Sequence, residues 1–350
     1  MDVTKARDIS SLVRQNILKM KPYSSARDEY SGSASVFLDA NENPFNDPLN
    51  RYPDPRQQKL KQGIAALKGI PVEQIFLGNG SDEGIDLLFR TLCEPGRDHV
   101  ITVDPSYGMY AVCAEINGVE RRSVLLNRDF SLDPDAVLAA VDEHTKLIFL
   151  CSPNNPTSNS LDREAVLKIL DEVSCLVVVD EAYIDFSRDP GLLSLLNEKW
   201  NLVLLQTLSK AWGLAGIRLG MLFGPAELVG YLSKVKYPYN LSSLTIDAAV
   251  KALEETGQSR GWIRQILDER NSLGKELESF NFVEKVHPSD ANFLLVKVDD
   301  PLDLYGYLMK RGIIVRDRSS VPLCEGCLRI TIGTPEENQD LITALKSYQP

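Results

Sequence analysis

A lysine that could react stands in the segment LLQTLSKAWGLAGIRLG, which covers residues 204–220. Lys210 follows an apolar run typical of a buried strand, and Arg218 comes eight residues later. Most lysines keep the ammonium group in water while the stem packs on apolar neighbours. A lysine held in a poorly solvated site near other cations has a lowered pKa, and its amine can form a Schiff base with an aldehyde. This segment alone leaves both interpretations open.

A carboxylate ends a second apolar run, VVVDEAY, at residues 177–183. Burying Asp180 costs free energy unless a cation or hydrogen-bond donors meet it. The side chain could cap the next segment, or it could pair with a protonated nitrogen of a heterocyclic ligand. The second interpretation makes Asp180 a candidate partner for a cofactor ring.

The segment GNGSDEG, residues 78–84, follows a predicted strand and opens a predicted helix. Gly80, Ser81 and Asp82 would present backbone N–H groups and a helix N-terminus to an anion. The segment is neither a Walker loop nor a dinucleotide-binding G-x-G-x-x-G motif, which disfavours a nicotinamide dehydrogenase. A simple helix cap explains Ser81 equally well.

Two further polar side chains follow predicted strands. Asn155, in SPNNPT, could donate a fixed amide hydrogen bond or belong to an ordinary turn. Tyr107, in DPSYGMY, could pack in the core or stack on a flat ligand. A phosphate cradle, a ring-nitrogen partner, an amide, a stacking ring and an amine together form the set that pyridoxal phosphate requires.

The elements that must position these residues form a regular alternation. Over residues 35–240, apolar β-branched runs end in Gly, Pro, Ser or Asn and lead into helical patterns, which predicts a mostly parallel sheet flanked by helices. Ligands bind beyond the carboxyl ends of such strands, where each candidate residue stands. Residues 241–350 predict a smaller α+β domain, with helices at 244–280, 301–311 and 335–347 and strands between them. Residues 1–34 are expected to form an N-terminal arm or helix that packs on the small domain.

Composition excludes several classes of protein. The 350 residues carry a net charge of −11, which argues against nucleic acid as a partner because binding it requires basic residues. No run approaches the ~20 apolar residues of a membrane span, and the N-terminus lacks an apolar signal-peptide core, so a cytoplasmic location is expected. Cys324 and Cys327 form a CxxC pair without a second pair or suitable histidines, so no metal is predicted.

The motifs GNGSDE, SPNNPT, VVVDEAY and TLSKAWGLAGIRLG, in this order, resemble those of fold-type I pyridoxal-phosphate-dependent aminotransferases. PYSSAR, LDANENPF, RYPDP, GIIVRD and CLRITIGT are similar to the histidinol-phosphate aminotransferase family, and the likeness spans nearly the whole chain. It implies pyridoxal 5'-phosphate as cofactor and amino transfer from L-histidinol phosphate to 2-oxoglutarate, giving imidazole acetol phosphate and L-glutamate in histidine biosynthesis.

The resemblance also assigns roles to residues. Lys210 would bind the cofactor covalently, Asp180 would pair with its ring nitrogen, and Tyr107 would stack on its ring. Asn155 and Tyr183 would hold the phenolic oxygen of the ring. The cofactor phosphate would be held by Gly80, Ser81, Asp82, Thr207, Ser209 and Arg218. Tyr52 would reach the partner subunit's cofactor, which implies a homodimer.

Tyr23, Asn155, Arg316 and Arg329 would bind substrate by the same resemblance. For Arg316, followed by Asp317 and Arg318, a solvated charged edge is the alternative. The chain has Ser158 where the family commonly has Gly, and Asp39 where Asn is frequent. A threonine-phosphate decarboxylase or a broad or aromatic aminotransferase on the same cofactor remains an alternative. A non-catalytic ligand-binding domain is disfavoured because Lys210, Asp180 and Arg218 are all present.

Overall fold

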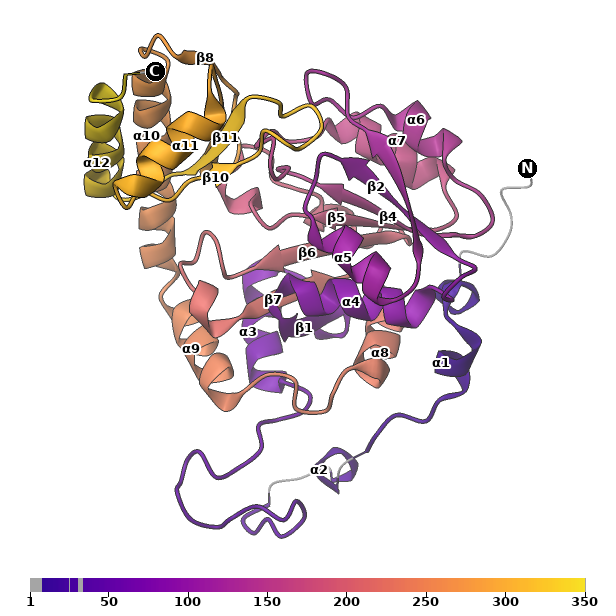
Figure 1. The fold of residues 1–350 in the computed structure, drawn as a ribbon. Helices are drawn as coiled ribbons and strands as arrows, with labels where there is room; N and C mark the ends of the chain where they lie inside the picture. The colour runs from indigo at the N-terminus through magenta and orange to yellow at the C-terminus, as the bar shows by residue number, and fades with distance from the viewer. Residues whose placement is uncertain (1–7, 25, 31–33, 350) are drawn as a thin grey trace.

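The computed structural model describes residues 8–24, 26–30 and 34–349, and its core is a seven-stranded sheet (Figure 1). From one edge to the other the strands are β1 (Ile75–Asn79), β7 (Leu219–Phe223), β6 (Leu202–Thr207), β5 (Leu176–Asp180), β4 (Thr145–Cys151), β2 (His99–Asp104) and β3 (Glu120–Leu125). Only β7 runs against its neighbours β1 and β6, and the other pairs in the sheet are parallel. The predicted mostly parallel sheet is therefore confirmed.

Helices cover both faces of this sheet. Along β5, Leu176 and Val178 enter one apolar cluster while Val177 and Val179 enter another, because alternate side chains point to opposite faces. One cluster includes residues of α4 (Gly80–Leu92), α5 (Met109–Ile116) and α8 (Ala226–Val235). The other includes residues of α3 (Gln58–Lys68), α6 (Pro134–Ala139), α7 (Arg163–Glu172) and α9 (Ser243–Glu254). The carboxyl ends of the parallel strands stay uncovered by these helices.

A second, antiparallel sheet of four strands forms from the C-terminal part of the chain (Figure 1). Its order is β10 (Arg316–Asp317), β11 (Cys327–Thr331), β9 (Phe293–Val298) and β8 (Val283–Val286). Its apolar cluster includes residues of α10 (Thr256–Leu277), α11 (Pro301–Lys310) and α12 (Pro335–Lys346). The helix predicted over residues 244–280 is two helices, α9 and α10, which meet at Glu255.

The described residues 9–18 pack against helices α4 and α8 of the large domain, not on the small C-terminal domain where the sequence analysis placed residues 1–34. Ile9, Leu12 and Ile17 are buried in the cluster that includes α4 and α8. The backbone is anchored there too, since Lys234 Nζ on α8 donates to the Ile17 carbonyl at 2.6 Å. The N-terminal segment thus covers apolar side chains of α4 and α8. Its own sequence did not show which surface it would pack against.

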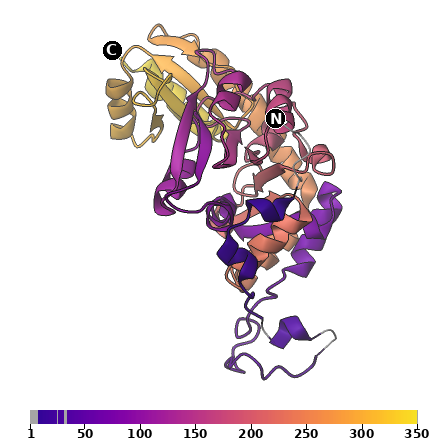
Figure 2. The same cartoon turned by 90° about the vertical axis from the view of Figure 1, so that its right-hand side faces the viewer.

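The chain between α1 (Gln15–Lys19) and α3 leaves the body of the molecule, as Figures 1 and 2 both show. We call the described residues between 20 and 57 the arm; they include the short helix α2 (Ala26–Glu29). The sequence analysis had assigned residues from 35 onward to the large domain, but the arm contributes no strand to either sheet. Among the described residues, no helix has the length and apolar character that crossing a bilayer requires.

Candidate active site

A cleft of about 720 Å³ lies between the carboxyl ends of the parallel strands and the hairpin of β10 and β11. It brings together most of the site residues that the sequence analysis named, from segments far apart in the chain. They are Gly80, Ser81, Asp82, Tyr107, Asn155, Asp180, Tyr183, Thr207, Ser209, Lys210, Arg218, Arg316 and Arg329.

The N-terminus of α4 forms one wall of the cleft. Gly80 begins the helix with φ +69°, and its N–H donates to the carbonyl of Arg218 at 2.8 Å. A Cβ on Gly220 would lie 2.1 Å from the carbonyl carbon of Gly80, so β7 can press against the start of the helix only with glycine there. This contact places the guanidinium of Arg218 beside the first turn of α4, with Nη2 3.4 Å from Asp82 Oδ2. A helix N-terminus beside a guanidinium is an anion site.

The hydroxyl groups of Thr207 and Ser209, at the end of β6, line the same cleft as the start of α4. The Ser209 N–H donates to Thr207 Oγ1 at 3.1 Å, and the two hydroxyl oxygens are 2.9 Å apart. This turn holds both hydroxyls at the edge of the cleft. Together with the start of α4 and Arg218, they provide the donors that a phosphate group needs.

Asp180 ends β5 and is buried. Tyr110 Oη donates to its Oδ2 at 2.8 Å, and the N–H of Ala182 donates to Oδ1 at 3.1 Å. Burial raises the pKa of Asp180 to about 6, although both hydrogen bonds favour the carboxylate. Sequence reasoning missed Tyr110; the signal was its position one helical turn after Tyr107. The carboxylate is poised to receive a cationic partner.

Lys210 follows β6, and its amine lies 5.6 Å from the ring centre of Tyr183. Burial lowers the pKa of Lys210, and the positive charge of Arg329 lowers it further. Both effects favour the neutral amine, the form that attacks an aldehyde. The Lys210 side chain is exposed to solvent at the edge of the cleft, so its lowered pKa, and not its burial in the core, supports the reactive interpretation.

Asn155 connects two other site residues. Its Nδ2 lies 3.4 Å from Tyr183 Oη, and its Oδ1 accepts a hydrogen bond from Arg329 Nη1 at 2.6 Å. Tyr183 is itself buried, and its ring meets the ring of Phe293 edge-on at 5.2 Å. The amide thus links the loop after β4 to strand β11.

Tyr107 also lines the cleft, beside the start of α4, where its hydroxyl donates to Asp82 Oδ1 at 3.0 Å.

Arginines from the β10–β11 hairpin close the cleft on the C-terminal side. Arg316 and Arg329 are direct partners in the register of the two strands. Arg318 also lines the cleft, although the sequence analysis gave it no role and named it only within the charged edge that was the alternative for Arg316. Its alternation with Arg316 along a strand was the available signal.

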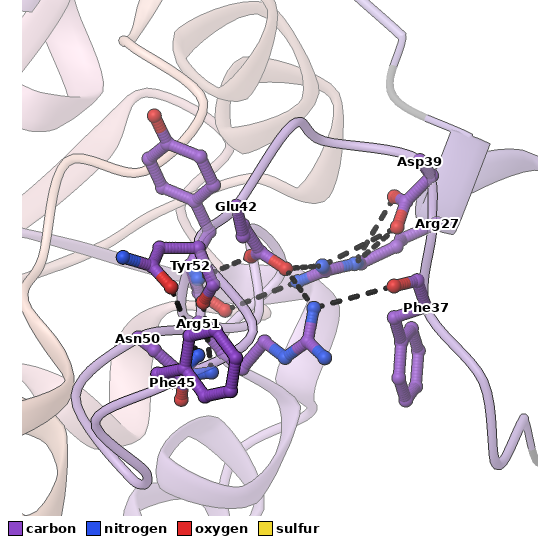
Figure 3. A network of polar contacts seen from close by, with 9 residues as sticks. Arg27, Phe37, Asp39, Glu42, Phe45, Asn50, Arg51 and Tyr52 are labelled. Carbon is purple, nitrogen blue, oxygen red and sulfur yellow. Dashed lines mark hydrogen bonds and ion pairs between the residues drawn. The ribbon is translucent and has the colours of Figure 1, made fainter.

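Tyr23 and Tyr52, both described, do not line this chain's cleft but lie on the arm. Tyr23 is 70% exposed, and Tyr52 is half exposed with its ring stacked on Tyr239 at 4.5 Å. Figure 3 shows how Glu42 organises this segment. Its carboxylate accepts from Arg27 Nη2 and Arg51 Nη1, each at 2.7 Å, and from the Tyr52 N–H at 2.6 Å.

The groups around the cleft fit a phosphorylated pyridine aldehyde. The start of α4 could hold its phosphate beside Arg218, where Gly80 takes a φ of +69° that residues with a side chain rarely adopt. The buried Asp180 could face a ring nitrogen, and Asn155 and Tyr183 could face a ring hydroxyl. Lys210 offers an amine to the aldehyde.

Comparison with known proteins agrees with this chemistry. A family model described as aminotransferase class I and II matches residues 31–345, so the chain belongs to this class, and pyridoxal 5'-phosphate is its cofactor. The chain is 57% identical to the histidinol-phosphate aminotransferase of Parabacteroides distasonis over 98% of this chain and 99% of that protein. It is 53% identical to the enzyme of that name from Bacteroides fragilis, over 98% and 100%. Within the class, the chain belongs to the histidinol-phosphate aminotransferase family.

The fold is also shared with a solved structure that carries the cofactor. The histidinol-phosphate aminotransferase of Sinorhizobium meliloti, solved with pyridoxal-5'-phosphate, superimposes with a TM-score of 0.77 at 27% identity. The match covers 84% of this chain and 82% of that one. The prediction of an aminotransferase of fold type I is confirmed.

Proposed function

We propose that this protein transfers the amino group of L-histidinol phosphate to 2-oxoglutarate, giving imidazole acetol phosphate and L-glutamate, as a step of histidine biosynthesis. The observation that carries the proposal is a single cleft in which Lys210, Asp180 and the paired Arg316 and Arg329 meet. The names of its full-length relatives favour this reaction over threonine-phosphate decarboxylation and over broad or aromatic amino transfer.

When bound, pyridoxal phosphate supplies an aldehyde that takes up the substrate's amine and a ring that accepts the electrons left by the departing α-proton. Lys210 would hold the cofactor's aldehyde carbon through Nζ, and the substrate's amine would free this Nζ by taking its place. The freed Nζ then accepts the α-proton as a general base and returns it as a general acid. Asp180 provides the negative charge that keeps the ring nitrogen protonated.

The remaining cleft residues bind and orient. Asn155 and Tyr183 hold the ring's phenolic oxygen, and Tyr107 stacks on the ring. The cofactor phosphate is bound by Gly80, Ser81, Asp82, Thr207, Ser209 and Arg218. Both substrates are anions on an acidic protein, so Arg316 and Arg329 supply the local attraction.

We further propose a homodimer in which the arm contacts the second copy. The arm exposes apolar side chains that a lone chain leaves in water, which is typical of an interaction surface. They include Tyr23, Val36, Leu38, Phe45 and Leu49. Tyr52, whose backbone is fixed by Glu42, would reach the cofactor phosphate of the partner, and Tyr23 would cover substrate. We also propose a cytoplasmic location, and the net charge of −11 argues against a nucleic-acid partner.

The half-reaction tests the proposed function. Purified holoprotein is mixed separately with histidinol phosphate, phenylalanine and threonine phosphate, and the visible band of the bound cofactor is followed. Histidinol phosphate should bleach the band fastest, and later addition of 2-oxoglutarate should restore it and yield glutamate. Faster reaction with phenylalanine, or carbon dioxide released from threonine phosphate, would contradict the proposal.

A further inference from the structure

Three arginines share one face of the β10–β11 hairpin. Arg316 lies directly opposite Arg329 in the antiparallel register. Arg318 stands two residues after Arg316, and its backbone N–H donates to the carbonyl of Cys327 at 2.9 Å, so it continues the edge of the same pairing. Side chains at positions i and i+2 of a strand point to the same face. All three arginines accordingly line the cleft.

The charge of this cluster is only weakly offset, because the Asp317 carboxylate raises the pKa of Arg318 less than burial and the charges of Arg329 and Arg316 lower it. Among ion pairs between described residues, none involves Arg316, Arg318 or Arg329. The intervening Asp317 instead accepts hydrogen bonds from the N–H and hydroxyl of Ser319, at 2.8 and 2.6 Å. Like charges opposite each other on paired strands are destabilising. The repulsion between these arginines would be relieved by a bound anion, so we interpret the cluster as an anion-binding site.

Arg318 has spare capacity for such an anion. Its Nε is buried and has no hydrogen-bond partner among the described residues. Burial lowers the pKa of Arg318, and the charges of Arg329 and Arg316 lower it further. Arg329, by contrast, already donates to Asn155 through Nη1. The Nε of Arg318 is therefore a buried donor left without a partner among the described residues of this part of the cleft.

We propose that Arg318 determines specificity by binding the phosphate of the amino donor together with Arg316. A phosphate monoester carries about −1.5 to −2 charges at neutral pH and three acceptor oxygens, so it can engage two guanidinium forks. A carboxylate has one charge and two oxygens, and the paired N–H groups of a single guanidinium can bind both oxygens. Arg318 thus favours the phosphorylated donor over the dicarboxylate acceptor. The inference rests on the proposed function.

The test measures the two half-reactions separately in wild-type holoprotein and in Arg318→Gln. Loss of one charge-assisted contact should raise the apparent dissociation constant for histidinol phosphate by about 10- to 100-fold. The constant for 2-oxoglutarate should change by less than about 3-fold, because one fork suffices for its carboxylate. Arg264→Gln, which alters an exposed arginine on α10, is the matched control and should leave both constants unchanged.

Two further measurements separate a role in phosphate binding from a general structural role of Arg318. Arg318→Lys retains the charge and should recover part of the affinity for the donor. Inorganic phosphate should compete with the donor in the wild type and lose potency in Arg318→Gln. Equal weakening of donor and acceptor, unchanged phosphate competition, or a Lys variant as weak as the Gln variant would overturn the proposal. If wild-type protein fails to react with histidinol phosphate, the proposed function fails, while direct binding of inorganic phosphate, measured by calorimetry in the wild type and in Arg318→Gln, still reports on Arg318.

Discussion

Asn155 accepts a hydrogen bond from Arg329 at 2.6 Å, across the boundary between the two sheets. This contact orients the guanidinium that we propose binds substrate, because Arg329 has no ion-pair partner among the described residues. The same amide faces Tyr183 through its nitrogen. One side chain therefore contacts both the proposed cofactor-binding Tyr183 and the proposed substrate-binding Arg329.

Removing this amide should impair both half-reactions. In Asn155→Ala, Arg329 loses its partner, and kcat/KM should fall by about 10- to 100-fold for donor and acceptor alike. Asn155→Asp keeps an acceptor for Arg329 and should retain more activity than Asn155→Ala. Steady-state kinetics with each substrate varied in turn give the answer. An Asn155→Ala protein with wild-type kcat/KM would show that the amide has no such role.

The contact between β7 and the start of α4 predicts a strict need for glycine. Gly220→Ala forces a Cβ into the backbone of Gly80 and should lower the free energy of unfolding by about 1 to 3 kcal/mol. It should also weaken cofactor binding, because the helix start must shift. Gly224→Ala is the control, since its Cβ would meet its nearest neighbour, Leu228, at an ordinary 3.5 Å. Urea unfolding and titration of the apoprotein with cofactor measure both effects; equal behaviour of the two variants would contradict the prediction.

The buried carboxyl of Asp180 predicts a pH dependence of apoprotein stability. Its folded pKa, about 6, lies above the ordinary 3.8, so the folded chain binds more protons than the unfolded chain between these values. The stability contributed by the protonated form is therefore lost as pH rises through about 6. Asp180→Asn removes the charge and should make the apoprotein more stable than wild type by about 1 to 3 kcal/mol near pH 8.

Urea unfolding of the two apoproteins near pH 5 and near pH 8, on either side of the folded pKa, measures this difference. Glu181→Gln is the control, because burial also raises the pKa of Glu181, to about 7, yet its side chain binds Leu192 and Gln206 outside the cleft. In both variants the free energy of unfolding should fall less between about pH 5 and about pH 8 than in the wild type. Only Asp180→Asn should also lower kcat, by more than about 100-fold. An Asp180→Asn apoprotein that keeps the wild-type dependence on pH would refute the assignment.

The arm predicts a link between Glu42 and assembly. Burial raises the pKa of Glu42, but the hydrogen bonds from Arg51, Tyr52 and Arg27 outweigh it and bring the pKa to about 2. Glu42→Ala removes the acceptor that Arg27, Arg51 and the Tyr52 N–H share, although Arg27 keeps Asp39 and Arg51 keeps the Phe37 carbonyl. It should raise the dimer dissociation constant at least about 10-fold. Activity should then depend on protein concentration. Asp39→Ala, which removes one contact of Arg27, is the milder control. Sedimentation velocity showing an unchanged dimer in Glu42→Ala would exclude this role.

The sequence predicted the residues of the cleft well because buried parallel strands appear as continuous apolar runs. The apolar runs of β5 and β6 fixed where Asp180 and Lys210 had to lie, since both follow strands that end at one edge of a sheet. Arg318 escaped prediction because its place depends on the pairing of β10 with β11, and β10 spans only Arg316–Asp317. Tyr110 escaped because its bond to Asp180 depends on how α5 packs on the sheet.

The N-terminal segment could not be placed from sequence for a similar reason. Ile9, Leu12 and Ile17 carry an apolar stripe, but a stripe does not identify the surface that covers it. The arm's ion pairs depend on a turn that brings Arg27 and Arg51 to Glu42 from opposite directions along the chain. Long-range contacts of this kind are set by tertiary structure, not by local pattern.

The most direct test of the account is the site of covalent attachment. Holoprotein is reduced with borohydride, digested, and its peptides are analysed by mass spectrometry. We predict a pyridoxyl group on Lys210 and on no other lysine, and neither the group nor turnover in Lys210→Ala. A cofactor attached to a different lysine, or full amino transfer by Lys210→Ala, would contradict the account.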